Sequence, residues 1–375
     1  MGKRDPRAGL AAIIATALVL AGCGTSTSVE STSSSVSTAA VTTAPTTETD
    51  APAPRSTATD PPPEQPIPVI WDDDGSPDGV IALLALLADP AYQVKAITIS
   101  CGEAHPEVFA ENLTRMLARL GREGVPVAAG RPTPLEGTNA FPEPWRAATD
   151  EFWGIDLPPA TQEADPAGAA QLIVDTVNTS AEPVMIFLTG NHTNVAEALR
   201  LDPSMADRIA VVEIMGGAIA VSGNIASDWV GIPNEVAEWN IWVDPVAADE
   251  VFRSSIPLRL VPLDATNHVV WTEADAATWE SSGSLEGEMA AEVLRWMLAS
   301  WFPDGVYAWD VVALADMARG DVCEHTDLAI HVDTAPGNEQ GRTIVDHGES
   351  PNTSVCLLPD PEATKALIAA AFQTP

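Results

Sequence analysis

The stretch "IWDDDGSPDGVIALLALLADP" (residues 70–90) decides the fold. It places four aspartates within seven residues, between an apolar β-rich run and an apolar helix-like run. One or two of these carboxylates can cap the helix that follows, where free N–H groups and the helix dipole stabilise negative charge. Four together repel one another unless a cation lies among them. Oxygen-only ligands select a hard ion, so the pattern favours calcium first and magnesium second.

Short apolar runs alternate with helical patterns from residue 67 onward. The β-rich runs are "IPVIW", "VKAITIS", "VPVAAG", "PVMIFLT" and "IAVVEIM", and the predicted helices cover 79–88, 106–120, 166–178 and 192–200. Continuously apolar strands, each followed by a helix, predict an α/β fold with a mostly parallel central sheet flanked by helices. Residues 321–375 predict a small C-terminal β-containing appendix. Ligands of such sheets bind at the carboxyl ends of the strands, where the aspartate cluster stands.

The N-terminal residues follow the order of features typical of an export signal. Basic residues precede an apolar run over residues 8–20 that is too short to span a bilayer comfortably. The run ends in "LAGC", which resembles a bacterial lipobox and implies cleavage before Cys23 and lipidation of its thiol. An ordinary secretory peptide with an incidental cysteine is the alternative. We expect a signal peptide over 1–23, a disordered Ser/Thr/Pro-rich tether over 24–66 and one folded domain over 67–375. The protein is then extracytoplasmic and lipid-anchored to the bacterial cell membrane.

Charge narrows the choice of partners. The chain carries 18 Lys plus Arg against 53 Asp plus Glu, a formal net charge of -35. This argues against nucleic acid and against an anionic membrane surface, so membrane contact is expected through the lipid anchor only. In an oxidising compartment Cys323 and Cys356 can pair, which leaves Cys101 as a buried free thiol. The sequence leaves that pairing open.

The aspartate stretch also carries a family resemblance. "VIWDDDGSPDGVIALLALL" resembles the N-terminal fingerprint of the inosine–uridine-preferring nucleoside hydrolases, an Asp-x-Asp-Pro-Gly-x-Asp-Asp turn from strand to helix. Further matches follow in order and cover about residues 67–320: "VKAITISCGE", "VPVAAGRPTPL", "FLTGNHTNVAEAL", "VEIMGGAIAVSGN", "VAEWNIWVDPVAADEVF", "LVPLDATN" and "YAWDVVALADM". The resemblance implies an N-glycosyl hydrolase that splits ribonucleosides into base and ribose. It also implies a calcium ion (Ca2+) that binds the ribose hydroxyls and the attacking water.

The resemblance assigns roles position by position. Asp74 matches a calcium ligand that also takes the proton from the water, Asp310 matches a second ligand, and Thr189 matches a residue that offers its backbone carbonyl. It further implies a set of ribose-binding side chains: Asp78 for the 2′-hydroxyl, Glu238 and Asn240 for the outer hydroxyls, and Asn224 as a third. A Lewis-acidic cation, a carboxylate base and surrounding oxygens suit a reaction that develops oxocarbenium-like charge.

One departure from the family motif concerns the metal. Gly79 stands where the motif ends in a second aspartate, a bidentate calcium ligand. At the end of the next strand the family usually has asparagine, and here "SCGE" places Glu103. We predict that Glu103 reaches the metal and replaces the lost carboxylate, since calcium tolerates rearranged oxygen shells. The alternative is a solvated Glu103 beside a weakened or dead calcium site.

A second departure concerns the leaving base. Many members have histidine before the final aspartate as the acid that protonates the base, and this chain has Trp309. A purine-specific subgroup carries tryptophan there and stacks the base on it. Because stacking on indole favours a flat base that gains positive charge, Trp309 predicts a purine preference and a role in purine salvage. A buried packing tryptophan is the alternative.

Three hypotheses follow. The first is a lipid-anchored ribonucleoside hydrolase that uses calcium. The second is a catalytically weakened nucleoside- or ribose-binding lipoprotein, motivated by Gly79 and the missing histidine. The third is a hydrolase of another ribosyl compound. Family members are often dimers or tetramers, so the resemblance leaves room for a homo-oligomer.

Overall fold

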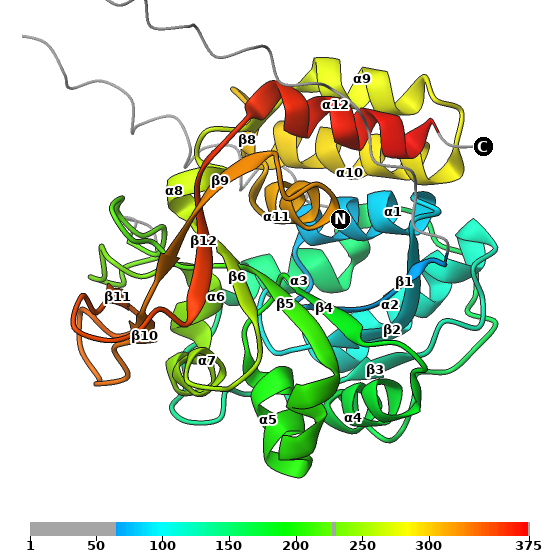
Figure 1. Cartoon of the computed structure of the whole chain (residues 1–375). Helices are drawn as coiled ribbons and strands as arrows, with labels where there is room; N and C mark the ends of the chain where they lie inside the picture. Colours follow the sequence, from blue (N-terminus) through cyan, green and yellow to red (C-terminus); the bar gives the residue numbers. More distant parts are fainter. Residues whose placement is uncertain (1–64, 227–229, 374–375) are drawn as a thin grey trace, which may run out of the picture. The chain divides into compact units, whose positions relative to one another are not determined.

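A computed structural model describes residues 65–226 and 230–373 (Figure 1). Its main sheet has eight strands in the order β3-β2-β1-β4-β5-β6-β12-β9. All neighbouring pairs run parallel except β12 and β9, which confirms the mostly parallel sheet. The strands are β1 (Ile67–Asp73), β2 (Tyr92–Ile99), β3 (Val127–Ala129), β4 (Val184–Leu188), β5 (Ile209–Met215), β6 (Leu258–Val261), β9 (Cys323–Leu328) and β12 (Thr353–Pro359).

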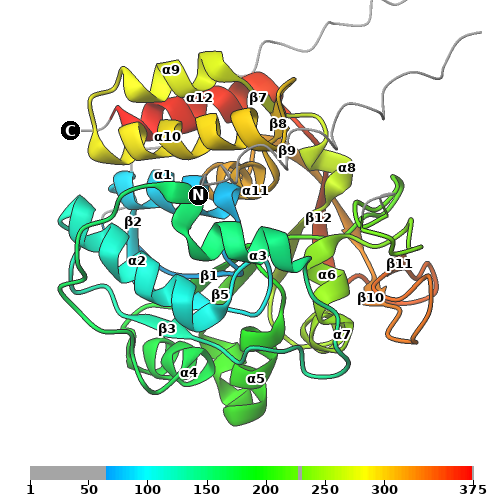
Figure 2. The same cartoon turned by 180° about the vertical axis from the view of Figure 1, so that it is seen from behind.

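Helices cover both faces of this sheet (Figures 1 and 2). Trp71 and Phe187 point to one face and pack with α1 (Pro77–Ala88), α2 (Pro106–Leu120), α10 (Leu285–Ser300) and α11 (Trp309–Ala318). Ile70 and Ile186 point to the other face and pack with α4 (Ala169–Thr179), α5 (Thr193–Leu201) and α7 (Pro245–Phe252). Successive strand residues alternate between the faces, so a strand covered on both sides must be apolar throughout.

The predicted helices are confirmed, with small shifts at their ends. The segment 106–120 coincides with α2, which has Pro106 in its first turn and ends at Gly121 in the left-handed region with φ 64°. Helix α1 begins two residues before the predicted 79 because Ser76 caps it and Pro77 fits the first turn. The remaining helical elements are α3 (Glu143–Asp150), the short helices Phe152–Gly154 and Pro203–Arg208, α6 (Trp239–Val243), α8 (Leu263–Thr266), α9 (Glu273–Glu280) and α12 (Pro361–Phe372).

The strand order creates a switch point beside β1. The chain runs from β1 outward through β2 to β3, then returns to place β4 on the other side of β1 and continues outward through β5 to β6. In such doubly wound sheets ligands bind outside the carboxyl ends of the strands where the order reverses. Here that place lies between the ends of β1 and β4, directly after Asp73 and Leu188.

The C-terminal segment contains strands, as expected, and two of them extend the main sheet. β12 lies between β6 and β9, and β10 (Ile330–Val332) pairs with β11 (Thr343–Val345) in a separate hairpin. A second two-stranded sheet joins β7 (Val270–Trp271) to β8 (Val306–Tyr307).

A disulfide links Cys323 to Cys356 across β9 and β12, and Cys101 is a buried free thiol, which settles the pairing that the sequence left open.

The predicted export features lie outside the described residues. This applies to Cys23, to the signal peptide over 1–23 and to nearly all of the tether over 24–66. Within 65–226 and 230–373, no helix is both long and apolar enough to cross a membrane.

Candidate active site

Three consecutive aspartates lead out of β1 into the turn before α1. Asp72, Asp73 and Asp74 are 0%, 0% and 1% exposed. Asp72 accepts hydrogen bonds at Oδ1 from Thr98 Oγ1 and Asn194 Nδ2, both at 2.7 Å. Burial raises the pKa of Asp72 and that of Asp73 to about 7, although both carboxylates accept hydrogen bonds that lower it. The strand therefore delivers acids into the protein interior at the switch point of the sheet.

The first turns of α1 and α11 meet at this cluster. Ser76 caps α1 by accepting a hydrogen bond from Gly79 N at 2.9 Å, and its Oγ donates to Asp310 Oδ2 at 2.8 Å. The N–H of Asp310 in turn donates to Asp78 Oδ2 at 3.0 Å. Burial raises the pKa of Asp78 to about 6. Two helix N-termini, each with an aspartate in its first turn, thus converge on one site.

Three buried carboxylate oxygens in this cluster have no hydrogen-bond partner in the described part of the chain. One is Asp72 Oδ2, and the other two are Asp74 Oδ2 and Glu103 Oε1. Burial raises the pKa of Asp74 well above its ordinary value, and the charges of Asp73 and Glu103 raise it further. Burial likewise raises the pKa of Glu103, with added repulsion from Asp78 and Asp73. A buried charge without a partner is costly, so these two oxygens call for a cation.

Thr189 brings a backbone carbonyl to the same place from the end of β4. Its N–H donates to the Asp72 carbonyl at 2.8 Å and its Oγ1 donates to Asp73 Oδ2 at 2.7 Å. Its carbonyl accepts a hydrogen bond from Asn240 Nδ2 at 2.9 Å. A carbonyl oxygen has two lone pairs, so it can still accept a second contact.

The segment around α6 carries the remaining predicted ribose-binding residues. Glu238 is 2% exposed and caps α6, because its oxygens accept from the N–H groups of Asn240 and Ile241. It also accepts from the N–H of Gly217 at 2.9 Å. Burial raises the pKa of Glu238 to about 7. Asn224 is exposed, and its Oδ1 accepts from Trp239 N at 3.1 Å. The structure therefore places Asn240 against Thr189, whereas the Glu238 oxygens are engaged by backbone groups and Asn224 holds a loop to α6.

Comparison with known proteins identifies the family. The model of the family described as "Inosine-uridine preferring nucleoside hydrolase" matches residues 69–366. The chain is 33% identical over 312 residues to the pyrimidine-specific ribonucleoside hydrolase RihA of Klebsiella pneumoniae (strain 342), covering 81% of this chain and 97% of that protein. RihA of Salmonella typhimurium is 34% identical over 319 residues, with 82% and 98% covered. The chain belongs to the inosine–uridine-preferring nucleoside hydrolase family.

Solved structures of nucleoside hydrolases share the fold. A purine-preferring ribonucleoside hydrolase from Gardnerella vaginalis superposes with a TM-score of 0.72 at 23% identity, covering 82% of this chain and all of that one. The inosine–uridine-preferring hydrolase from Bacillus anthracis gives 0.69 at 22% identity, with 82% and 100% covered. Ribonucleoside hydrolases are N-glycosyl hydrolases, so the enzyme class predicted from the aspartate motif is confirmed.

Nucleoside hydrolases commonly bind a metal ion, and the acidic cluster offers suitable donors. Asp74 and Glu103 supply unpartnered buried carboxylate oxygens, which suit a hard cation. These carboxylates do not form a compact trio. In the described ranges, the only three acidic, histidine or cysteine side chains with ligand atoms within 4.8 Å of one another are Asp316, Cys323 and Cys356, and the two cysteines form the disulfide. A cation among the aspartates therefore needs backbone carbonyls or waters to complete its shell.

Trp309 lies in a packed aromatic group beside Asp310. It is half-buried, and its ring centroid lies 5.8 Å from that of Phe302 and 6.1 Å from that of Tyr307. The group continues through Phe302, Trp301, Trp145 and Trp239 to Phe141. Packing thus fixes the indole of Trp309, and part of its surface stays exposed.

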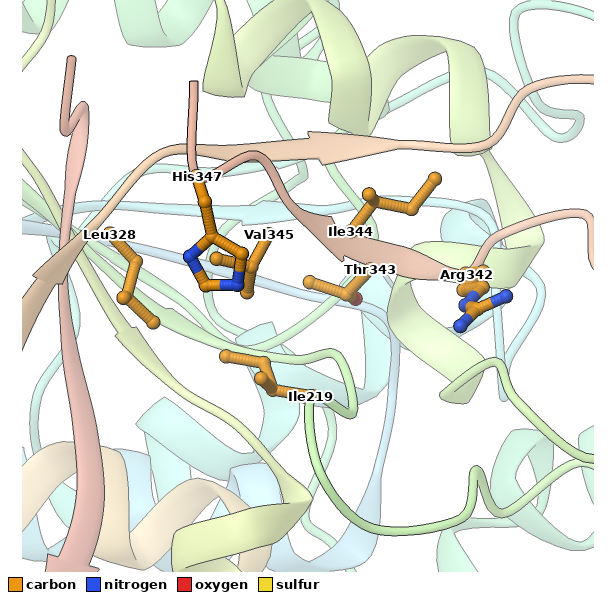
Figure 3. A pocket seen from close by; sticks show the side chains of 7 residues that line it. All are labelled: Ile219, Leu328, Arg342, Thr343, Ile344, Val345 and His347. Atoms are coloured by element: carbon orange, nitrogen blue, oxygen red, sulfur yellow. The ribbon is translucent and has the colours of Figure 1, made fainter. Parts of the chain in front are cut away.

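Two of the cavities in the described ranges have linings that include none of the acidic residues named above. The smaller has a volume of about 150 Å³ and is lined by Cys101, Gly102 and Arg146 among others, which places it next to Glu103 in the sequence. The larger, about 410 Å³, lies at β11 and is lined by Ile219, Leu328, Arg342, Thr343, Ile344, Val345 and His347 (Figure 3). None of the site residues predicted from the sequence is among these seven. The larger cavity is therefore separate from the residues predicted from the sequence.

Sequence reasoning gave no role to Asp73 or Ser76. Asp73 accepts from Gly75 N at 2.7 Å and Ser76 N at 3.2 Å, and so holds the turn between β1 and α1. An aspartate two residues before Gly-Ser is typical of a turn in which the side chain binds the backbone two and three residues on. The local signal was present, but the long-range partners of these residues, Thr189 and Asp310, could not be read from it.

Proposed function

We propose that this nucleoside hydrolase splits the N-glycosidic bond of ribonucleosides to base and ribose with calcium held in the acidic site. The observation that carries the proposal is the pair of unpartnered buried oxygens on Asp74 and Glu103 at the switch point of the sheet. Calcium takes six to eight oxygen ligands at about 2.3–2.6 Å, so the carboxylates would close in on the ion, with backbone carbonyls and waters completing its shell.

The residues that would hold calcium are Asp74, Glu103, Asp310 and the Thr189 carbonyl. When bound, the ion supplies a Lewis acid that lowers the pKa of water and orients the ribose hydroxyls. Asp74 serves as the base, because its Oδ2 is free of other hydrogen bonds and can accept a proton. The buried oxygens around it favour positive charge on the sugar ring as the bond to the base breaks.

Ribose binding falls to residues at the rim of this cluster. Asp78 would bind the 2′-hydroxyl from the first turn of α1, and Asn240 stands against Thr189, from where it can serve an outer hydroxyl. Glu238 and Asn224 contribute on the same side. In this structure Glu238 accepts three backbone N–H groups, so its role toward the sugar uses the remaining lone pairs of its two oxygens.

Trp309 supports a purine preference, because a half-buried indole fixed by its neighbours presents a rigid surface on which a purine stacks over a larger area than a pyrimidine. The RihA relatives are pyrimidine-specific, which argues for the opposite preference. The ratio of kcat/KM for inosine and uridine decides between them. A ratio above one supports the purine preference, and a ratio below one rejects it.

We also propose that the chain is exported and anchored through Cys23, on the strength of the "LAGC" sequence after an apolar run. The full chain expressed in a bacterium should label with palmitate and sediment with membranes. Cys23→Ala should abolish the label. A wild type that stays unlabelled would reject the anchor, and light scattering of the mature chain would report whether it forms a homo-oligomer.

The hydrolase proposal is tested with the mature chain. It is incubated with inosine, guanosine, adenosine, uridine and nicotinamide riboside, with and without chelator, while reducing sugar is followed. Sugar release that stops with chelator and resumes with added calcium supports the proposal. Nucleoside binding without release from any substrate would instead favour the binding lipoprotein, and release from nicotinamide riboside alone would favour a different ribosyl substrate.

Glu103→Gln tests the predicted metal ligand separately. The substitution keeps the shape of the side chain but removes its charge. We expect calcium affinity to fall at least tenfold and turnover to fall with it. Unchanged affinity and turnover would refute a ligand role for Glu103.

A further inference from the structure

Gly79 lies in a place where the protein has no room for a side chain. It is in the first turn of α1, and a Cβ built on it would lie 2.2 Å from Asp73 Oδ2 and 2.6 Å from Ser76 Oγ. Real Cβ atoms essentially never approach other heavy atoms to less than 3.0 Å. Glycine is the poorest helix former after proline, so helix propensity does not account for its presence. The space that a side chain would need is taken by the Asp73 carboxylate.

The Asp73 carboxylate is held firmly in that space. It is 0% exposed. Its Oδ1 accepts from the N–H groups of Gly75 and Ser76, at 2.7 Å and 3.2 Å, and its Oδ2 accepts from Thr189 Oγ1 at 2.7 Å. One side chain therefore ties the turn after β1 to the end of β4, on the two sides of the switch point.

These contacts reach three of the groups that would hold the metal. Asp74 lies between Asp73 and the turn that Asp73 fixes. Thr189, whose hydroxyl Asp73 binds, carries the backbone carbonyl that points to Asn240. Ser76, whose N–H Asp73 binds, donates from its hydroxyl to Asp310 Oδ2.

Asp73 differs from the candidate ligands in how its oxygens are used. Both of its oxygens have hydrogen-bond partners in the described structure, whereas Asp74 Oδ2 and Glu103 Oε1 have none. Its bonds to backbone and hydroxyl donors suit a residue that orients ligands.

We propose that Asp73 and Gly79 are one functional unit, in which Asp73 positions Asp74, Thr189 and Asp310 for the metal and Gly79 keeps free the space that its carboxylate occupies. This inference rests on the proposed function for the identity of the metal. Asp73 is a positioning residue, and Glu103 supplies the ligand charge that position 79 lacks.

A double-mutant cycle tests the unit. The variants are Gly79→Ala, Asp73→Ala, the double variant and Asp73→Asn. Calcium affinity is measured by titration calorimetry, and the unfolding midpoint in urea is measured in EGTA. Gly320→Ala is the matched control, since its added Cβ would meet only Arg259, at 4.0 Å.

Each single change should weaken calcium binding at least tenfold. Gly79→Ala should also lower the unfolding midpoint, although alanine is the better helix former. In the Asp73→Ala background the same Gly79→Ala change should cost less, because the clash with the carboxylate is gone and only the close contact with Ser76 Oγ, at 2.6 Å, remains. Asp73→Asn keeps the acceptor for the turn and the size of the side chain, so its affinity should stay within about threefold of the wild type. Gly320→Ala should change neither quantity.

Three results would overturn the proposal. Additive effects of the two substitutions would show that Asp73 and Gly79 are independent. A loss in Asp73→Asn as large as in Asp73→Ala would make Asp73 a ligand. Unchanged calcium affinity in Asp73→Ala would remove its positioning role.

Failure of the proposed function would look different. A chain that binds calcium but releases no sugar fails as a hydrolase. The calcium affinities of the double-mutant cycle still test whether Asp73 and Gly79 act together. A wild type that binds no calcium overturns both the calcium assignment and the positioning role, and the unfolding midpoints in EGTA then report only whether the two residues are coupled.

Discussion

Removing the Ser76 hydroxyl should cost more stability than removing an ordinary helix cap. Ser76 accepts from Gly79 N at 2.9 Å at the start of α1 and donates to Asp310 Oδ2 at 2.8 Å. Loss of a serine cap costs about 1 kcal/mol. Leaving a buried acceptor without its donor adds about 1–3 kcal/mol. Ser76→Ala should therefore lower the free energy of unfolding by about 2–4 kcal/mol.

The chain offers a matched control at α10. Ser284 caps that helix by accepting from Gly287 N at 3.1 Å, which is the same local arrangement of serine and glycine. Its other side-chain partner is Ser282 Oγ, so it stabilises no carboxylate. Ser284→Ala should cost about 1 kcal/mol. The difference between the two variants then measures the contact between Ser76 and Asp310.

Urea unfolding of both variants in EGTA gives the two free energies. Calcium affinity of Ser76→Ala should also fall about tenfold, because Asp310 loses the group that orients it. Equal losses in the two variants, within about 0.5 kcal/mol, would show that the contact with Asp310 contributes nothing to stability, and the reasoning from the buried acceptor would be wrong.

Three further predictions use other parts of the fold. His192 is fully buried, neither of its ring nitrogens has a hydrogen-bond partner among the described residues, and burial lowers its pKa to about 3. The folded state accommodates only the neutral imidazole, so the free energy of unfolding is unaffected by His192 above pH 6.5 and falls by about 1.4 kcal/mol per pH unit from there toward pH 3. In His192→Phe the free energy of unfolding, measured with urea, should depend less steeply on pH over that range. An unchanged slope would contradict this. Reduction of the Cys323–Cys356 disulfide, with 33 residues of separation, should cost about 3–4 kcal/mol. The double serine variant should then no longer respond to reductant, whereas the buried Cys101, whose pKa burial raises to about 12, should stay inert to thiol reagents. Calcium at 100 times its Kd should raise the free energy of unfolding by about 2.7 kcal/mol, and no change on adding chelator would contradict a bound ion.

Much of the fold follows from local signals in the sequence. β4 is apolar throughout because both of its faces are covered, and α2 has its proline at the start and its left-handed glycine at the end. The place of β12 could not be predicted, because its neighbours β6 and β9 are fixed by pairing with residues far away in the chain. Long-range pairing leaves no periodic trace within one strand.

The same division holds at the site. Asp74 and Asp78 could be placed because a strand end and a helix start bring them to a predictable edge. The contact between Ser76 and Asp310 joins residues 234 positions apart, and nothing in either local sequence names the other. The clash between Asp73 and a side chain at position 79 likewise appears only when β1 and α1 are seen in three dimensions.

The absence of an aspartate at position 79 does not by itself favour the binding-only alternative. Several carboxylates remain buried around the switch point, among them those of Asp73, Asp74, Asp78, Glu103 and Asp310. Burial and mutual repulsion disfavour their charged forms, so at neutral pH the cluster requires protons or a cation. A site that only bound ribose would have no use for this charge, since neutral donors and acceptors hold hydroxyl groups at lower cost. Metal binding therefore tests whether the cluster is a cation site, and turnover of a nucleoside tests whether that cation serves catalysis.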